Sequence, residues 1–409
     1  MTHSGGGSPA HNTGPAFITL LGLCSGLSAF GMASVVPALP ALSRMLHASY
    51  GSIQFLVSSY LLGLALFQPL QGILCDRFGR RPVLLLGFSI FAIASVAASL
   101  AASLPLLVLA RFLQALGVSV ATVVSRAMVR DTHAPERAAV ALSFISAVMG
   151  IAPILAPLAG GLVLDGFGWR GIFVMHSGMA LILLLWMSFS LRETRPATLV
   201  PPTVRQLLAG FAVLVRDARF MGNTLTYGFV SGAMFSFITV GAEIFHINFG
   251  IGATQFALVW ALLSFANMAG AATAGTFARR IGTRRVMQFG MRLNIVSGAL
   301  FLLVCLWPVP YLWAYLATLA LQIASNGLVS PLALAGAVSD HPSLAGIASG
   351  LSSALAMLVS MVSAIAAGVF FSGSALSCAV QMLVGCICAS VAVRFAFRPA
   401  HAKSLRNSL

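Results

Sequence analysis

The sequence predicts an all-α integral membrane protein, with about twelve transmembrane helices arranged as two pseudo-symmetric six-helix bundles. Three observations support this fold class. Of the 409 residues, 59% are hydrophobic and only 8% are charged, whereas soluble domains carry roughly 25% charged residues. Apolar stretches near the ~20 residues that a helix needs to cross a bilayer recur along the whole chain. Finally, a basic motif occurs twice, about half a chain apart, which indicates two similar halves.

The repeated motif lies in short basic turns between long apolar stretches. The residues shared by the two copies, at equal spacing, are Gly72, Arg77, Gly79, Arg81, Val83 and Gly87 in the first and Gly275, Arg280, Gly282, Arg284, Val286 and Gly290 in the second. A parallel repeat of this kind in a membrane protein is typical of transporters.

The apolar stretches define the expected spans and their grouping. We expect spans at 16–38, 51–74, 82–102, 105–128, 138–163, 171–191, 221–246, 254–277, 285–306, 310–334, 344–368 and 374–396. The longest polar break divides them into six and six. The domains follow as a disordered cytoplasmic N-terminus (1–15), an N-terminal six-helix bundle (16–191), a cytoplasmic linker with an amphipathic helix (192–220), a C-terminal bundle (221–396) and a cytoplasmic tail (397–409). The amphipathic helix could lie on the inner leaflet or simply tie the two halves together.

The arginines predict the orientation. Nearly all of them fall in alternate gaps between spans, and only Arg44 and Arg170 fall in gaps on the opposite side. Because basic residues stay in the cytoplasm, both termini are expected there. The formal net charge of +15 therefore reflects topology, and we expect no nucleic-acid partner. The six cysteines lie in or beside apolar segments and predict neither a metal site nor a disulfide framework.

One motif resembles a known family. The stretch Gly72-x-Leu74-x-Asp76-Arg77-x-Gly79-Arg80-Arg81 resembles the loop 2–3 motif of the major facilitator superfamily, and it lies between the expected second and third spans. The fourth-span motif of proton-coupled members resembles Arg111-Phe-Leu-Gln114-Ala-Leu-Gly117, and the fifth-span motif of exporters resembles Gly150-Ile-Ala-Pro153-Ile-Leu-Ala-Pro157-Leu-Ala-Gly160-Gly161. Four shorter stretches resemble the Bcr/CflA (bicyclomycin and chloramphenicol resistance) branch of drug:proton antiporters: Arg130-Asp131, Trp169-Arg170, Glu193-Thr194 and Pro37-Ala-Leu-Pro40.

The resemblance implies a function. It implies secondary active transport in the bacterial inner membrane, by a monomer that exports drug-like or hydrophobic molecules by alternating access in exchange for protons. A facilitator or exporter of one metabolite, such as a sugar, nucleoside or amino acid, is the alternative. An enzyme is not expected, since the histidines are scattered without metal spacing and no ATP-binding loop is present. We expect no cofactor.

The resemblance also implies a conformational latch on the cytoplasmic side. Its expected residues are Gly72, Asp76, Arg77, Gly79, Arg80, Arg81 and Asp131. Asp76 is expected near the start of span eleven, where a helix N-terminus favours a carboxylate. Asp131 and Glu136 are the expected partners of Arg80 and Arg77. Loop charges that only fix topology are the alternative.

Proton coupling is assigned to Arg111, Gln114 and Glu243. An intramembrane arginine should face a cavity or a partner, although a structural hydrogen bond to Gln114 or to carbonyl groups would also satisfy it. The Bcr/CflA branch usually has an aspartate where this chain has Ala33, and the first span holds no acid. Glu243 could replace that aspartate, because a carboxylate in low dielectric can exchange a proton near neutral pH. Alternatively, span seven ends early and Glu243 lies in a loop.

The remaining expectations concern span five and the substrate. Gly150, Pro153, Pro157, Gly160 and Gly161 should allow close packing and bending, which the family resemblance interprets as a seal for export. The candidate substrate contacts are Tyr227, Met234, Phe235, Asn267, Gln322 and Asn326, for which ordinary helix packing is the alternative. Asp165 is expected to pair with Arg170 at the outer face.

Overall fold

The structure is a computed structural model that describes residues 14–196 and 203–397, and within those ranges the long elements are all helices. The first half contains α1 (Pro15–Ala33), η2 (Val36–Ala38), α2 (Leu39–Met45), α3 (Tyr50–Ile53), α4 (Phe55–Phe78), α5 (Arg80–Ser99), α6 (Leu104–Val118), α7 (Val120–Thr132) and α8 (Pro135–Ser190). After α9 (Val204–Arg216), the second half contains α10 (Ala218–Phe249), α11 (Ala253–Ile281), α12 (Thr283–Leu306), α13 (Leu312–Ser339), η3 (Pro342–Leu344), α14 (Ala345–Val369) and α15 (Ala375–Ala396).

Helix α8 contains two spans that join at a bend, with no loop between them. Its 56 residues would extend roughly 84 Å at about 1.5 Å per residue, far beyond the ~30 Å of one hydrocarbon core. Gly168 lies inside it with φ of 70° and breaks the helical path. The described chain has eleven helices long and apolar enough to cross a membrane. Because α8 supplies two crossings, the expected twelve spans are present.

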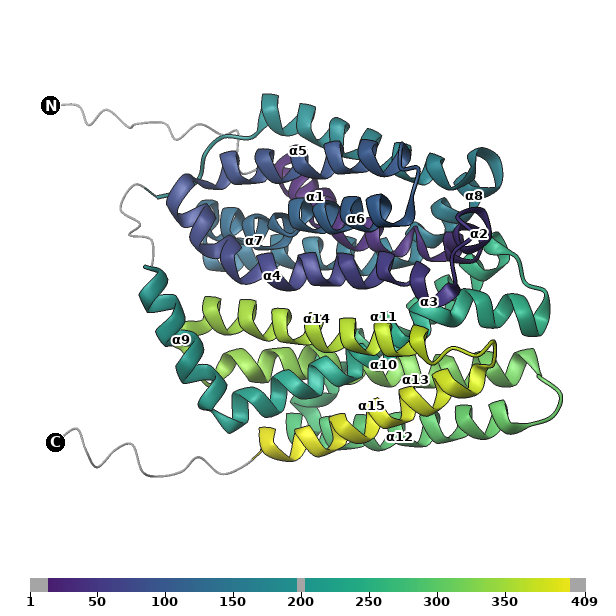
Figure 1. The fold of residues 1–409 in the computed structure, drawn as a ribbon. Coiled ribbons are helices and arrows are strands. Elements are labelled where there is room, and N and C mark those ends of the chain that lie inside the picture. The colour runs from purple at the N-terminus through teal and green to yellow at the C-terminus, as the bar shows by residue number, and fades with distance from the viewer. Residues whose placement is uncertain (1–13, 197–202, 398–409) are drawn as a thin grey trace, which may run out of the picture.

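The two halves form separate helical bundles that lie against each other. Figure 1 shows the purple-to-teal helices of the first half on one side and the green-to-yellow helices of the second half on the other. Helix α9 and the ends of α1 and α15 that lead to the two termini lie at one end of the molecule. We call this the basic end, because the arginine-rich turn between α4 and α5 is there. The opposite end, which carries α2 and α3, is the distal end.

Small residues let the helices of each bundle approach closely, as is usual in membrane proteins. A Cβ atom added to Gly87 of α5 would lie 2.5 Å from the carbonyl oxygen of Gly117 on α6. A Cβ atom added to Gly222 of α10 would lie 2.3 Å from the backbone nitrogen of Ala396 on α15. Larger side chains at these glycines would force the helices apart.

The two halves contact each other at the distal end and along α4 and α14. At the distal end, the Tyr50 hydroxyl donates a hydrogen bond to the carbonyl oxygen of Thr239 in the other half, at 3.1 Å. Toward the basic end, a Cβ atom added to Gly350 of α14 would lie 3.4 Å from the Cα atom of Pro69 of α4, whereas one added to Gly72 of α4 or Gly275 of α11 would meet no atom of the described chain within 4 Å. The halves therefore stay in contact along α4 and α14, with open space beside Gly72 and Gly275.

Helix α9 is amphipathic, as its sequence predicts. Thr203 caps it in a capping box, accepting from the backbone nitrogen of Gln206 at 3.2 Å. Leu207 and Leu214 are buried, and Leu214 packs in a cluster with residues of α10, α13 and α14. Leu208 remains exposed. The helix is thus fastened to the second half.

Candidate functional site

Arg80 is the centre of an ionic network at the basic end. Its Nη1 atom donates to Asp76 of α4, four residues earlier, and its Nε atom donates to Asp131 of α7 at 3.1 Å. The Arg80 side chain is only 5% exposed. A buried arginine shared by two carboxylates joins α4, α5 and α7 through charge-assisted hydrogen bonds. Arg80 and Asp131 form the pair expected from the sequence.

The other expected latch residues lie around this network without joining it. Arg77 stacks over the ring of Phe78, with its Cζ atom 5.5 Å from the ring centroid, and the expected ion pair between Arg77 and Glu136 is not among the salt bridges of the described residues. Arg81 donates to the carbonyl oxygen of Ser188 on α8 at 3.0 Å.

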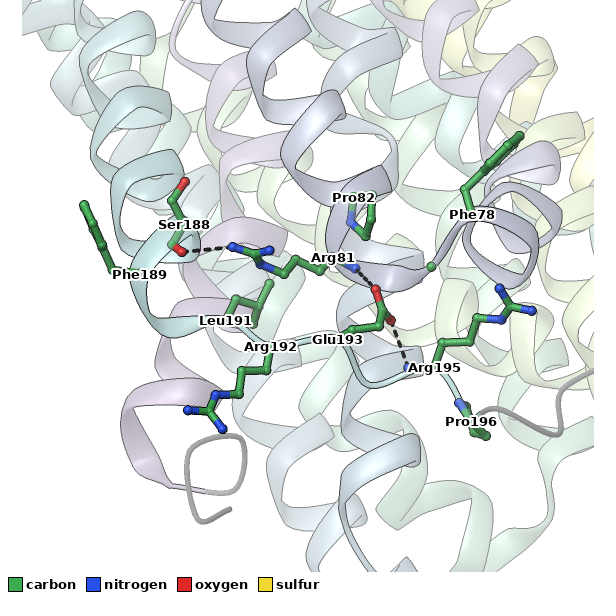
Figure 2. A pocket seen from close by; sticks show the side chains of 11 residues that line it. Phe78, Arg81, Pro82, Ser188, Phe189, Leu191, Arg192, Glu193, Arg195 and Pro196 are labelled. Carbon is green, nitrogen blue, oxygen red and sulfur yellow. Dashed lines mark hydrogen bonds between the residues drawn. The ribbon is translucent and has the colours of Figure 1, made fainter. Parts of the chain in front are cut away.

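Glu193 has a structural role that sequence reasoning missed. Its carboxylate accepts hydrogen bonds from the backbone nitrogens of Arg80, Arg81, Thr194 and Arg195, at 2.9 to 3.0 Å. Figure 2 shows the bonds from Arg81 and Arg195. Partial burial raises its pKa, but these backbone N–H groups outweigh that effect and the pKa is lowered. Two of the donors are the first N–H groups of α5, so Glu193 caps that helix from the far end of α8.

Gly79 makes this cap possible. It has φ of 99° and ψ of 157°, a conformation that is essentially restricted to glycine. A Cβ atom there would lie 2.6 Å from Oε2 of Glu193. Gly282, its counterpart in the repeat, has φ of 89° and ψ of 141° but no neighbour within 4 Å in the described chain. The repeat preserves the turn, and only the first copy has a carboxylate against it.

Arg111 lies in the core of the first half, 1% exposed. Its Nη1 atom donates to the carbonyl oxygen of Gly31 at 3.0 Å and to Oε1 of Gln114 at 2.9 Å. The guanidinium also lies over the ring of Tyr60, with Cζ 4.2 Å from the ring centroid. Gln114 in turn donates to Ser95 at 2.7 Å. These contacts all come from the first half. They favour the alternative in which Arg111 makes structural hydrogen bonds to Gln114 and to a carbonyl group, rather than facing a cavity.

A buried histidine lies near this arginine. His176 in the second arm of α8 is completely buried and forms a hydrogen bond between Nε2 and the Ser34 hydroxyl at 2.7 Å. Phe91 and Phe173 surround its ring. An isolated histidine among apolar residues gives no sequence signal, so only the structure reveals this position at the end of α1.

The second half contains a counterpart of the Arg111 network without the charge. A serine is bonded to a glutamine in both halves, but the direction of the hydrogen bond differs. Ser297 donates to Gln322 at 2.5 Å, whereas Ser95 accepts from Gln114. Asn294 and Asn326 complete the cluster, with Gln322 donating to Asn294 at 2.7 Å. Gln322 and Asn326 are 0% and 1% exposed. Because their partners belong to their own half, these two candidates have the geometry of helix packing.

Gly160 and Gly161 of span five lie at the distal end, whereas Gly150 has no atom of the described chain within 4 Å of an added Cβ atom. Gly160 packs so closely on the carbonyl oxygen of Ser34 that a Cβ atom would overlap it. A Cβ atom on Gly161 would lie 3.1 Å from the Cα atom of Thr254 in α11 of the other half. The carbonyl oxygen of Pro153 accepts a 3.4 Å hydrogen bond from Ser264 of α11. Pro157 lies buried between these contacts.

The expected pair of Asp165 and Arg170 does not form. Asp165 accepts a hydrogen bond from the Thr254 hydroxyl of the other half. Arg170 instead stacks on Trp169, 4.3 Å from the ring centroid, and donates to the carbonyl oxygen of Ala101 at 3.2 Å. The bend at Gly168 separates the two side chains, so the carboxylate joins the contact between the halves.

Glu243 lies inside α10 rather than in a loop, because that helix continues to Phe249. Its Oε2 atom is buried and has no hydrogen-bond partner in the described chain. Tyr50 of the first half interacts with it electrostatically. A cavity of about 430 Å³, lined in part by Arg44 and His246, lies close by at the distal end. Glu243 is thus a half-buried carboxylate at the contact between the halves.

The expected substrate stripe on α10 is partly accessible. Tyr227, Met234 and Phe235 are half-buried. Arg126, near the end of the expected span 105–128, lies within α7 and interacts electrostatically with Tyr227 across the two halves. Asn267 of α11 is half-buried and donates to the carbonyl oxygen of Ile323 at 3.4 Å.

Comparisons with known proteins agree with this architecture. A family model described as Major Facilitator Superfamily matches residues 21–364. The chain belongs to the major facilitator superfamily. A bicyclomycin resistance protein homolog of Haemophilus influenzae is 25% identical over 82% of this chain and 84% of its own. Multidrug resistance protein D of Escherichia coli is 29% identical over 77% of this chain and 79% of its own. The resemblance to the Bcr/CflA branch is thereby confirmed.

Solved structures of this superfamily share the fold. A bacterial homolog of the human lysosomal transporter Spinster, in an inward-facing and occupied conformation, superimposes with a TM-score of 0.75 at 17% identity, covering 96% of this chain and 97% of that chain. A D-xylose–proton symporter gives a TM-score of 0.73 at 18% identity, covering 94% and 97%. The predicted fold class is confirmed, and so is the prediction that the protein is a transporter and not an enzyme.

Proposed function

We propose that this major facilitator protein exports drug-like or hydrophobic small molecules by alternating access, in exchange for protons. The observation that carries the proposal is the similarity, over most of the chain, to proteins named for multidrug and bicyclomycin resistance. The sequence identity to the xylose symporter is 18%, so that similarity concerns the fold and does not favour a sugar substrate.

The proposed orientation puts the basic end in the cytoplasm of a bacterial inner membrane, with both termini on that side. Among the described residues at the distal end, the arginines are Arg44 and Arg170, whereas the turns at the basic end are rich in arginine. The open space beside Gly72 and Gly275 at the basic end supports an inward-facing state. We further propose that the monomer is the functional unit.

The Arg80 network is the proposed fixed part of the cytoplasmic latch, which holds Asp76 in position. In the inward-facing state Arg80 is bound by Asp76 and Asp131 of its own half. When the halves close at this end, Asp76 can approach the start of α14, where a helix N-terminus favours its charge. The latch would thus exchange partners between the two states, with Arg80 holding Asp76 in place throughout.

Glu243 is the proposed proton carrier. Its Oε2 atom is buried where the two halves meet and has no hydrogen-bond partner in the described chain, which supports this role. When the distal end is open, the carboxylate would take up a proton from the outside, and drug binding in the inward-facing state would release that proton to the cytoplasm. Glu243→Gln should abolish concentration of substrate driven by an imposed pH gradient, while substrate binding survives.

The proposed substrate surface comprises Tyr227, Met234 and Phe235 of α10, with Asn267 of α11 at its edge. Aromatic and methionine side chains suit chemically varied apolar ligands. Arg126 adds one cation opposite Tyr227, so substrates with a hydrogen-bond acceptor should be preferred over purely cationic ones.

Transport in proteoliposomes tests the function directly. Purified protein would be reconstituted, a pH gradient imposed, and the accumulation of a panel of drugs measured, including bicyclomycin and chloramphenicol. We expect accumulation of at least one drug that collapses when a protonophore is added. Accumulation of a sugar, nucleoside or amino acid alone would support the metabolite alternative, and accumulation insensitive to the pH gradient would contradict proton coupling.

A further inference from the structure

A cavity of about 760 Å³ lies at the basic end, on the first half, between the start of α5 and the end of α8. It lies beside the Arg80 network, and no residue proposed to contact substrate lines it. Figure 2 shows Arg81 at the start of α5, with Arg192, Glu193 and Arg195 in the segment that follows α8. The cavity is therefore a feature of the first half alone and is separate from the space between the halves.

The lining of the cavity has an excess of positive charge. Arg81, Arg192 and Arg195 contribute three guanidinium groups. Glu193 is the one acid in this lining, and its carboxylate already accepts hydrogen bonds from four backbone N–H groups. Arg81 and Arg195 are each positioned by a bond to a backbone carbonyl, that of Ser188 at 3.0 Å and that of Arg77 at 2.9 Å. Because a guanidinium has five N–H donors, one such bond orients the group without exhausting it.

An apolar surface adjoins these arginines on the membrane-spanning helices. Phe189 at the end of α8 is 87% exposed, and Leu185, one turn earlier, is 60% exposed. Leu86 on α5 is 62% exposed. Helices α5 and α8 both cross the membrane, so these side chains face lipid just inside the level of the arginines. A ligand that fits both surfaces needs an anionic head and a long apolar tail.

We propose that this cavity binds the headgroup of an anionic glycerophospholipid. Its phosphate lies in the cavity near Arg81 and Arg192, with Arg195 adding its charge from the other side of Glu193 (Figure 2), and its acyl chains run along the exposed faces of α5 and α8. Guanidinium groups bind phosphate oxygens in fixed, paired geometry, and basic pockets between membrane helices at the cytoplasmic face suit anionic headgroups. A soluble phosphate compound would leave Phe189 and Leu185 without a partner.

The repeat supplies a matched control. Arg280, Arg284 and Arg285 of the second half lie at the same end, in or near the second copy of the motif, and all are exposed. Changing these three arginines to glutamine removes as much positive charge as changing Arg81, Arg192 and Arg195. Wild-type protein, R81Q/R192Q/R195Q and R280Q/R284Q/R285Q would be compared by native mass spectrometry in detergent with added phosphatidylglycerol. A second pocket variant, R192Q/R195Q, retains the Arg81 contact with Ser188 in case the triple variant fails to fold.

Each arginine near an anionic headgroup should contribute about fivefold in affinity. We expect R192Q/R195Q to weaken phosphatidylglycerol binding by more than tenfold, and R280Q/R284Q/R285Q to change it by less than twofold. Phosphatidylcholine should not be retained by the wild type, and millimolar glycerol 1-phosphate should not displace phosphatidylglycerol. Equal losses in pocket and control variants, or equal retention of phosphatidylcholine, would overturn the proposal. Displacement by glycerol 1-phosphate would mean a soluble-phosphate site and overturn the lipid assignment.

Discussion

Substitution of Gly79 by alanine tests the turn that connects α4, α5 and the end of α8. A residue with a side chain at φ of 99° costs about 1–3 kcal/mol in backbone strain. The new Cβ atom would also lie 2.6 Å from Oε2 of Glu193, so the carboxylate must leave the start of α5. Losing a helix cap costs a further ~0.5–2 kcal/mol. The total destabilisation should therefore be about 1.5–5 kcal/mol.

Gly282→Ala is the matched control, because Gly282 has φ of 89° but no neighbour within 4 Å among the described residues. It should show the backbone strain without the loss of the cap. We would measure apparent melting temperatures of the purified proteins in detergent and expect Gly79→Ala to melt lower than Gly282→Ala. Glu193→Ala should cost less in the Gly79→Ala background than in the wild type, since the cap is already lost. Equal melting temperatures for the two alanine variants, with additive effects of Glu193→Ala, would refute the reasoning.

Three further predictions follow from individual contacts. Asp76→Asn should lower drug transport in proteoliposomes by at least tenfold while leaving the amount of membrane-inserted protein unchanged; a normal rate would leave this residue a topological role only. Gly160→Ala should impair transport and lower the melting temperature because its Cβ atom overlaps the carbonyl oxygen of Ser34, whereas Gly150→Ala, with nothing within 4 Å in the described chain, should behave as wild type; similar behaviour of both would count against the span-five contact. Because the pKa of Glu193 is lowered from its ordinary value of 4.5, the stability that its charge provides is complete above that pH and is lost as the pH falls through the lower, folded-state pKa. The melting temperature of Glu193→Gln should depend less on pH below 4.5 than that of the wild type, and an identical pH dependence would argue against the cap.

Periodic features of the sequence predicted much of the fold. Hydrophobic length identified the spans, and the repeat placed Gly79 and Gly282 in equivalent turns, which the structure shows with φ of 99° and 89°. The expected gap between spans five and six is instead a bend within α8 at Gly168. A glycine inside an apolar stretch does not by itself distinguish a loop from a kink.

Contacts between distant residues could not be predicted in the same way. Glu193 caps a helix that begins at Arg80, and no local pattern connects the two. The partners of Arg111 include the backbone carbonyl of Gly31, which has no side-chain signature. The pairing of Asp165 with Thr254 depends on how the two halves meet. Proximity in sequence suggested Arg170 instead, and the bend at Gly168 prevents that pair.

The most direct test of the central claim is proton release on drug binding. The protein in weakly buffered detergent would be mixed with a drug that proteoliposome transport has identified as a substrate, while pH and binding are recorded together. We predict that binding releases protons from the wild type and that Glu243→Gln binds the same drug without release. Binding by the wild type with no proton release between pH 6 and pH 8, or undiminished release from Glu243→Gln, would contradict the account.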